Sequence, residues 1–250
     1  MKKLGLFAAI LTVGTLQVTA MAGSEDLVNS GLASKIRVEL KNGETDPAEV
    51  ISKYIKAVGG KEKISKILNS VRVMEADFQG NIILMKGISD QQNGRMMQET
   101  SVMGNVVQKT IVVNGEGTIS TMGQEQAITE EMMQMIKSQM YLFPEGHYEE
   151  MGFGLEIRGT EKISGEDVHA LVITFPNGMK IMEYYSVRSG LKLKTSSDAT
   201  GDIDYSDYQE VDGILIPMTL TITNAMLPTA LEGKVTSILF NQELTDADFK

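Results

Sequence analysis

The sequence contains no cysteine and no tryptophan, and only two histidines and five prolines among 250 residues. Without cysteine the chain has no thiol nucleophile, no thiolate metal ligand, no disulfide and no lipid-modified N-terminal cysteine. It also has no Gly-x-Ser-x-Gly nucleophile motif, no Walker phosphate-binding loop and no dinucleotide-binding glycine fingerprint after a predicted strand. Because most catalytic schemes lack their parts here, we expect a protein that is not an enzyme and needs no cofactor.

The groups that could ligate a metal are poorly arranged for that purpose. His147 and Glu150 come near the inverted zinc-peptidase motif H-x-x-E-H, but Met151 stands where the second histidine would be. The aspartates within 202–207 lack the dense ligands and the turn glycine of a calcium loop, so we expect a solvated strand face there. We predict no metal site. A hydrolase built on two paired carboxylates stays open, although no spacing selects a pair.

Basic residues are scarce relative to acidic ones. The chain has 23 lysines and arginines against 33 aspartates and glutamates, which gives a formal net charge of −10. Such acidity argues against nucleic acid and anionic membrane surfaces as partners.

Long apolar runs are missing beyond the N-terminus. Met1-Lys-Lys3 is followed by an apolar run over 4–13 and then by Ala20-Met-Ala22, the pattern of a secretory signal peptide with its cleavage site. A membrane anchor is the alternative, but the run is short and contains glycine and threonine. We therefore predict a signal peptide at 1–22 and a soluble periplasmic protein without stable membrane insertion or lipid anchor. Secretion from the cell stays open.

The remaining chain is predicted to form a polar lead segment at 23–44 and a single domain at 45–250. Thr45-Asp46-Pro47 places a capping residue before a proline at the first helical position, so a helix is expected from there to Gly59-Gly60. A second short helix is expected over 61–68. Further on, Thr129 followed by two glutamates predicts a third helix, because acids are favoured in the first turn.

Strand patterns separated by glycine-containing turns dominate from Val71 onward. The runs 168–175 and 179–185 flank Pro176-Asn-Gly178 and predict an antiparallel hairpin. Both faces of its first strand are apolar, which indicates a sheet that is covered on both sides. About ten strands are predicted, at 71–78, 81–86, 95–100, 105–113, 153–159, 168–175, 179–185, 191–197, 202–210, 213–223 and 234–241.

So many consecutive strands must curl into a barrel or fold into two layers. We predict a mainly β (α+β) fold, a strongly curved antiparallel sheet that forms a half-barrel with helices on its concave side. This arrangement accounts for two apolar sheet faces with few helices better than a sandwich does.

Methionine is present in excess, with 17 residues. Met132, Met133, Met135 and Met140 gather on the helix predicted from Thr129, and flexible, polarisable side chains suit surfaces that accept irregular apolar guests. The pattern favours an adaptable lid over an apolar cavity, with ordinary core packing as the alternative. Copper(I), which thioethers bind, is a third interpretation, but no histidine or cysteine reinforces the methionine pairs.

We predict an apolar ligand site between this helix and the sheet. Its predicted lining is Met132, Met133, Ile136 and Met140 from the helix, with Leu171, Ile173, Ile216, Met218 and Leu220 from the strands. The strand residues assume that the face carrying Leu171 is the concave one.

Four segments resemble outer-membrane lipoprotein-sorting proteins: Tyr54-Ile-Lys-Ala-Val-Gly-Gly-Lys61, Glu75-Ala-Asp-Phe-Gln79, 184–191 and 207–217. Over about 45–250 the chain looks like the periplasmic lipoprotein carriers (LolA/LolB-like), and it is similar to carrier-like regions that accompany insulinase-type zinc peptidases. The resemblance implies an open half-barrel whose lidded concave face holds acyl chains. It also implies a buried arginine that latches the lid, and Arg72 lies only next to that region.

The sequence therefore predicts a non-enzymatic periplasmic carrier that holds a lipid acyl chain or a lipoprotein-like apolar ligand in a lidded sheet cavity. The rival interpretation is an interaction or scaffold module of the cell envelope with a filled core, which would be a partner of a zinc peptidase under the second resemblance.

Overall fold

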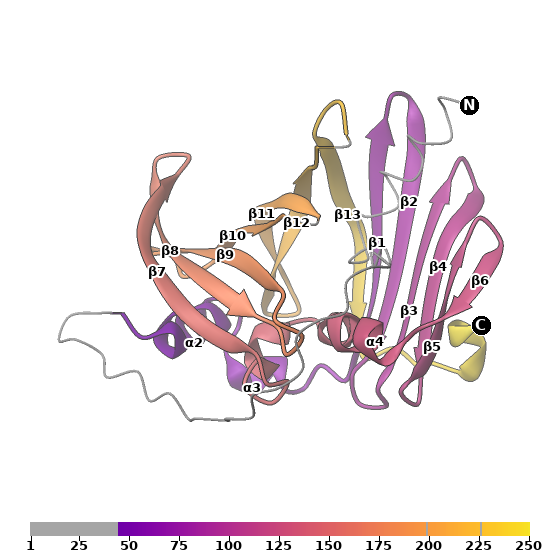
Figure 1. Ribbon diagram of the computed structural model, residues 1–250, viewed down its shortest axis with the longest axis horizontal. Helices are drawn as coiled ribbons and strands as arrows, with labels where there is room; N and C mark the ends of the chain where they lie inside the picture. Colours follow the sequence, from indigo (N-terminus) through magenta and orange to yellow (C-terminus); the bar gives the residue numbers. More distant parts are fainter. Residues whose placement is uncertain (1–44, 199, 226) are drawn as a thin grey trace, which may run out of the picture.

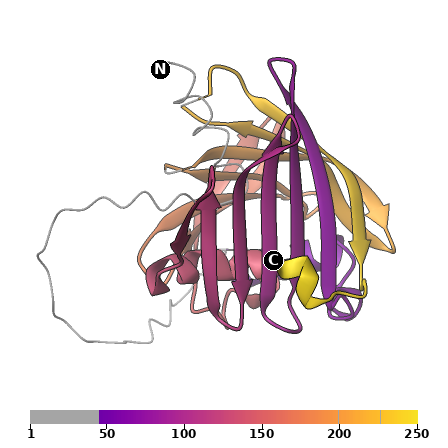
Figure 2. The same cartoon turned by 90° about the vertical axis from the view of Figure 1, so that its right-hand side faces the viewer.

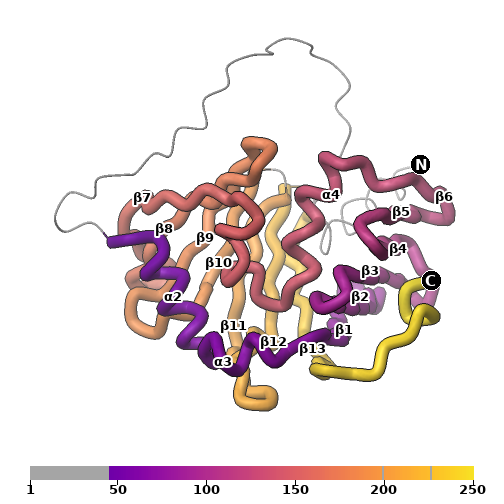
Figure 3. Tube along the Cα trace, turned by 90° about the horizontal axis from the view of Figure 1, so that it is seen from below, coloured from indigo at the N-terminus to yellow at the C-terminus, as the bar shows by residue number. Residues whose placement is uncertain are grey.

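One antiparallel sheet of thirteen strands makes up most of the protein. The computed structural model describes residues 45–198, 200–225 and 227–250. The spatial order of the strands is β6-β5-β4-β3-β2-β1-β13-β12-β11-β10-β9-β8-β7, so the first and last strands pair at the centre and β6 and β7 form the two edges. The sheet curls into an arc that does not close (Figures 1 and 3).

The element bounds are as follows. The strands are β1 (Asn69–Phe78), β2 (Asn81–Asp90), β3 (Arg95–Val102), β4 (Asn105–Val113), β5 (Glu116–Thr121), β6 (Gln124–Ala127), β7 (Gly154–Ile163), β8 (Glu166–Thr174), β9 (Lys180–Ser186), β10 (Lys192–Ser197), β11 (Gly201–Val211), β12 (Ile214–Thr223) and β13 (Leu231–Phe240). The helices are α2 (Pro47–Ala57), α3 (Lys61–Ile64) and α4 (Glu130–Ile136), with 3₁₀ turns η1 (Lys137–Met140), η2 (Pro144–His147) and η3 (Asp246–Phe249).

The predicted class is confirmed, but the strand number of about ten is wrong. The sequence interpretation missed β5 and β6. Every residue of β6 is exposed and its Gln-Glu-Gln-Ala sequence has no apolar alternation, because an edge strand needs no buried face. The predicted signal peptide and lead segment, 1–22 and 23–44, lie outside the described residues, and the single domain at 45–250 stays a prediction.

The helices begin where their capping residues predict. The Asp46 carboxylate accepts a hydrogen bond of 2.9 Å from the backbone N–H of Ala48, and the Thr129 hydroxyl accepts one of 3.3 Å from that of Met132. The methionine-rich helix is short and continues as the 3₁₀ turn η1. No helix in the described ranges is both long and apolar enough to cross a membrane.

Helices lie on both faces of the sheet, but the large core is on the concave side. Val50 and Tyr54 of α2 pack in one cluster with Leu171 and other inward residues of the sheet. On the outer face, Phe249 of η3 forms a smaller cluster with side chains from β2 and β3. Figure 2 shows η3 in front of the strands and α4 behind them, so these two elements lie on opposite faces.

Gly117 in β5 has no room for a side chain. An added Cβ would lie 2.4 Å from the carbonyl oxygen of Ile111 and 2.8 Å from Cδ1 of Ile128, whereas an added Cβ at Gly87 in β2 meets nothing within 4 Å. We expect Gly117→Ala to lower the free energy of unfolding by about 1–3 kcal/mol, because the β4–β5 backbone must shift. The control Gly87→Ala should leave stability unchanged or raise it by about 0.5 kcal/mol. Urea unfolding of both variants tests this, and equal stabilities would contradict the close packing of β5 on β4.

Candidate functional site

Strand register places three rows of residues on the concave face of β1 to β4. The row nearest the helices is Ser70, Ser89, Met96 and Val112. The next, here called the polar row, is Arg72, Gly87, Gln98 and Thr110. The third is Met74, Met85, Thr100 and Gln108. Because alternate residues of a strand share a face, the rows follow directly from the pairing.

The segment formed by α4 and η1, here called the Met-rich segment, lies across the first of these rows. Its inward side chains pack in one cluster with residues of β3, β4 and β5; the cluster contains Met132, Ile136, Met140, Met96, Val112 and Ile119. The Ser89 hydroxyl donates a hydrogen bond to the carbonyl oxygen of Met140. The Gln98 side-chain amide donates one of 2.9 Å to Gln139 Oε1. The segment is therefore held by apolar packing and by two polar contacts.

A buried charged cluster holds the chain that follows the Met-rich segment. Nζ of Lys192 in β10 forms ion pairs with Glu145 of η2 and, at 3.2 Å, with Glu183 of β9. The hydroxyls of Tyr148 and Tyr185 donate hydrogen bonds of 3.0 and 2.5 Å to the two carboxylate oxygens of Glu183. These five residues, the Lys192 cluster, fix η2 to the far half of the sheet.

The Lys192 cluster contains two carboxylates and one ammonium group. Burial lowers the pKa of Lys192, but the attraction of Glu145 and Glu183 outweighs it and raises that pKa well above its usual value. Burial raises the pKa of Glu145, since Lys192 compensates for it only in part. Oε2 of Glu145 is buried without a hydrogen-bond partner. An enclosed network of ion pairs and hydrogen bonds of this kind is suited to stabilising the fold. This network was not identified from the sequence. The available signal was Glu183, which stands between the apolar residues Ile181 and Tyr185 on one strand face.

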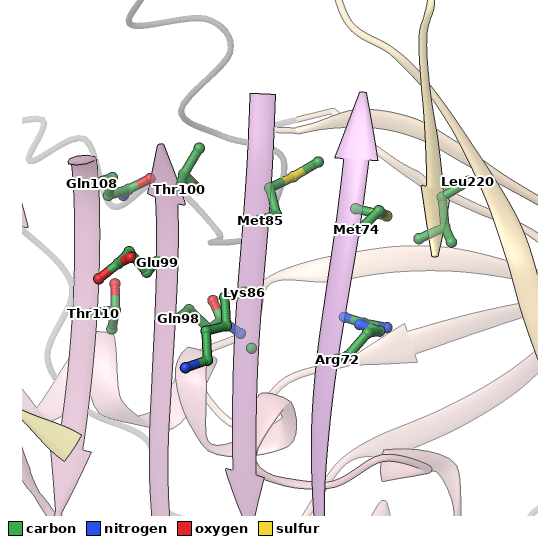
Figure 4. A pocket seen from close by; sticks show the side chains of 11 residues that line it. Arg72, Met74, Met85, Lys86, Gln98, Glu99, Thr100, Gln108, Thr110 and Leu220 are labelled. Atoms are coloured by element: carbon green, nitrogen blue, oxygen red, sulfur yellow. The ribbon is translucent and has the colours of Figure 1, made fainter. Parts of the chain in front are cut away.

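Two small cavities meet at the polar row. One has a volume of about 70 Å³ and the other of about 60 Å³, and Arg72, Gly87 and Gln98 line both. Thr110 lines the first cavity, and Gln139 of the Met-rich segment lines the second. Together they are called the polar hollow, and Figure 4 shows the side chains that line the first cavity, on neighbouring strands.

Polar atoms in the hollow lack partners within the described protein. Thr110 is fully buried, and neither its hydroxyl oxygen nor Oε1 of Gln98 has a hydrogen-bond partner. Desolvation by the surrounding protein lowers the pKa of Arg72. The side chain is still accessible from the concave space, and it keeps its charge.

The nine predicted ligand residues fall into two groups. Met132, Ile136 and Met140 are buried against the sheet, and half-buried Met133 packs at the edge of that cluster. The strand residues Leu171, Ile173, Ile216, Met218 and Leu220 belong to the large concave core, and Leu220 also lines the polar hollow. The structure therefore places all nine inward, but Leu171 and Ile173 are fully buried in the half that α2 covers.

Met133 also lines an open groove of about 720 Å³ at the sheet edge. Ile111 and Val113 of β4, Gly117 of β5 and Ile128 line the same groove. A largely apolar groove of this size is within the range of small-ligand sites. Met133 belongs to the concave side, whereas Ile111 and Val113 pack with the outer cluster of Phe249, so residues of both faces line the groove near the edge of the sheet.

The residues weighed as metal ligands make other contacts. The ring of His147 stacks on Tyr141 at 4.0 Å, and its Nδ1 lies 3.2 Å from Glu150. Asp202 pairs with Lys194 at 2.5 Å. Within the described ranges, no group of three or more histidine or acidic side chains is arranged to hold a metal ion.

Removing the ammonium group of Lys192 should show how much its ion pairs contribute to the free energy of unfolding. We expect Lys192→Met to cost about 3–5 kcal/mol of unfolding free energy at neutral pH, because two buried carboxylates lose their cation. Glu145→Gln should cost at most about 1.5 kcal/mol, since one cation and one carboxylate remain paired. Carboxyls without their cation have folded-state pKa values above the unfolded ones, so the Lys192→Met deficit should shrink as the pH falls towards about 5. Urea unfolding at several pH values measures this, and a deficit independent of pH would contradict it.

Comparison with known proteins identifies the fold. No protein-family model matches the chain, and a search of curated proteins finds no match. Among solved structures, a DUF1329 family protein from Desulfovibrio piger superposes with a TM-score of 0.55 at 13% identity, covering 82% of this chain and 98% of that one. A domain described as an outer membrane lipoprotein-sorting protein from Vibrio parahaemolyticus gives 0.56 at 13% identity, with 82% and 97% covered. A LolA superfamily protein from Nitrosomonas europaea gives 0.54 at 10% identity, with 83% and 98% covered.

The matches cover nearly the whole length of each of these three structures. At this level of identity the likeness concerns the fold. The chain has a LolA-like fold.

Proposed function

We propose that this protein is a non-enzymatic carrier of the bacterial periplasm that holds an acyl chain or a lipoprotein-like apolar ligand. The ligand would lie between the Met-rich segment and the concave face, and would emerge into the groove at the sheet edge. The observation that carries this proposal is that Met132 and Met140 of the segment pack in one apolar cluster with Met96 of the sheet. Unbranched methionine side chains on both sides of an interface can repack around a guest at small cost.

Burial of apolar surface supplies the affinity. Each Å² of apolar ligand surface removed from water contributes about 25 cal/mol, so a long acyl chain can be held without covalent chemistry. The helical part of the segment has only seven residues and is followed by a 3₁₀ turn, which leaves little regular structure to disrupt when it moves.

The likeness to a lipoprotein-sorting domain and to a LolA superfamily protein supports a carrier over other uses of the sheet. The signal-peptide pattern at 1–22 supports export, and the chain offers no cysteine for a lipid anchor. We therefore place the carrier in the periplasm, free of stable membrane insertion.

A second function, docking to another envelope protein, is favoured by a separate observation. Four exposed apolar residues lie at one end of the sheet: Ile82, Met103, Val106 and Met122, with 52, 72, 51 and 49% of their surface accessible. Hydrogen bonds join this end, from Met103 N–H to the Ile82 carbonyl and from Met122 N–H to the Val107 carbonyl. Exposed apolar surface of this kind marks contacts with partners. A donor or acceptor of the ligand, or the zinc peptidase of the second resemblance, is such a partner.

Met133→Glu tests the carrier. Met133 is half-buried, so the variant should fold, but a carboxylate beside the acyl chain should weaken uptake of a fluorescent fatty acid about tenfold or more. Gln134→Glu adds the same charge at an exposed position of the same helix and should leave uptake unchanged.

Urea unfolding of both variants separates loss of binding from loss of fold. The mature protein purified from cells should also release lipid into organic solvent. Wild-type protein that carries no lipid and ignores the probe would overturn the proposal in favour of an interaction module with a filled core.

A further inference from the structure

Arg72 holds a positive charge in the polar hollow and has no ion-pair partner of its own. Glu99 also lines the first cavity, but its carboxylate pairs with Lys109 at 3.0 Å. The ion pairs among the described residues do not include Arg72. Two cations of the sheet with little exposed surface are paired: Arg95 binds Asp90 at 2.6 Å, and Lys192 binds two glutamates. Because Arg72 is accessible from the concave space, its unpaired guanidinium is available to an anion that enters there.

The neighbours of Arg72 add further unpaired polar atoms at the same place. The hydroxyl of Thr110 and Oε1 of Gln98 are buried without partners, and both residues line the cavity that Arg72 lines. A buried polar atom left without a partner costs about 1–3 kcal/mol. A polar ligand group in the cavity would give a hydrogen-bond partner to both of these side chains and to the unpaired guanidinium. If both amide groups are turned by 180°, Gln139 donates to Gln98 and the hydrogen bond between them is kept. The Gln98 atom that faces the hollow is then its NH₂ group instead of its oxygen.

Gly87 leaves space for a ligand group beside Arg72. It stands directly between Arg72 and Gln98 in the polar row, and the position of its missing Cβ has no atom within 4 Å. Any larger residue would fill the space beside the guanidinium. The two cavities of about 70 and 60 Å³ that meet there hold about two water molecules each, which is room for the oxygens of a small head group.

We propose that the polar hollow binds the carboxylate of a long-chain fatty acid, with Arg72 donating two parallel hydrogen bonds and Thr110 and Gln98 completing the site. This inference rests on the proposed function, since it gives the apolar ligand its head group. A single guanidinium matches the two oxygens of a carboxylate. A dianionic phosphate would need further cations. Lys86 also lines the first cavity, but it is the neighbour of Gly87 in β2 and therefore belongs to the opposite face of the sheet.

The path of the alkyl chain follows from the register. From the hollow, the adjacent row runs across Met96 and Val112 to Gly117, which lines the groove beside Met133. Strands are about 4.8 Å apart, so the distance from β1 to β5 is about 19 Å, which an extended palmitate chain can span. The chain would lie beneath the Met-rich segment and displace its methionine side chains from the sheet.

The test compares palmitate with methyl palmitate, which has the same chain and no charge. Isothermal titration calorimetry of the full mature protein should show palmitate binding about 10- to 100-fold more tightly than the ester. Arg72→Gln should remove this preference and leave affinity for the ester unchanged, and Arg72→Lys should restore part of it, because charge remains but the two-pronged geometry is lost.

A second variant controls for folding. Thr110→Val replaces an unpartnered buried hydroxyl with a methyl group, so it should keep or raise the free energy of unfolding while weakening palmitate binding about tenfold. The ¹³C signal of carboxyl-labelled palmitate should report a carboxylate that stays ionised at lower pH in wild-type protein than in Arg72→Gln.

The outcomes separate the two proposals. Equal affinity for palmitate and its ester in wild-type protein would overturn the head-group site and leave the carrier standing. A preference for palmitate that survives in both Arg72→Gln and Thr110→Val would also overturn this site. Binding of neither compound would contradict the proposed function itself.

Discussion

The pairing register of β1 to β4 is the constraint on which the concave face depends. Arg72 lies opposite Gly87, Gly87 opposite Gln98 and Gln98 opposite Thr110, so one row carries a charge, a gap, an amide and a hydroxyl. A slip of one residue in any pair would turn that strand's inward side chains to the outer face. The outer face fixes the register independently, because Ile88 and Met97 pack under Phe249 there. The same hydrogen-bond ladder therefore specifies the outer core and the inner hollow together.

The two halves of the arc have different interiors. Beneath α2 and η2 the space is filled by aromatic side chains and by the Lys192 cluster, in which each ion pair is enclosed and geometrically fixed. Beneath the Met-rich segment the contacts are thioether to aliphatic, with small cavities beside them. Ion pairs in a dry interior resist rearrangement because separating them leaves a buried charge, whereas methionine contacts are exchanged readily. The fold thus combines a rigid anchor with an adaptable surface along one continuous chain from 130 to 148.

Local signals in the sequence predict the local structure well. Asp46, Pro47 and Thr129 cap helices as expected, since capping depends on neighbouring residues alone. The edge strand β6 was missed because its residues face water on both sides and no burial pattern marks it. The class of an open, curved sheet could be predicted from the number of consecutive strands. The central pairing of β1 with β13 could not, because it joins residues far apart in the sequence.

The candidate site is harder to predict, since its residues acquire meaning only through long-range pairing. Arg72 alternates into the same strand face as the apolar Met74, Ala76 and Phe78, but the sequence does not show that Gln98 and Thr110 lie across from it. Glu183 and Lys192 are likewise ordinary surface types, and only the fold brings them to Glu145. The apolar residues were easier to assign to the inner face, because the periodicity of apolar residues in a helix or strand identifies the buried face even when the contacting element is unknown.

Gln98 connects the polar hollow to the Met-rich segment. Its amide donates to Gln139 on the Met-rich segment, and the other end of the same amide faces the hollow beside Arg72. A group that bound in the hollow and accepted a hydrogen bond from Gln98 would require this amide to turn, and the Gln139 amide would have to turn with it to keep the hydrogen bond between them. Because the segment has few other polar ties to the sheet in the described structure, among them the bond from Ser89 to Met140, a change at Gln98 acts on its attachment directly. Under the proposed function, a ligand in the hollow would therefore act on the attachment of the segment through the Gln98 side chain.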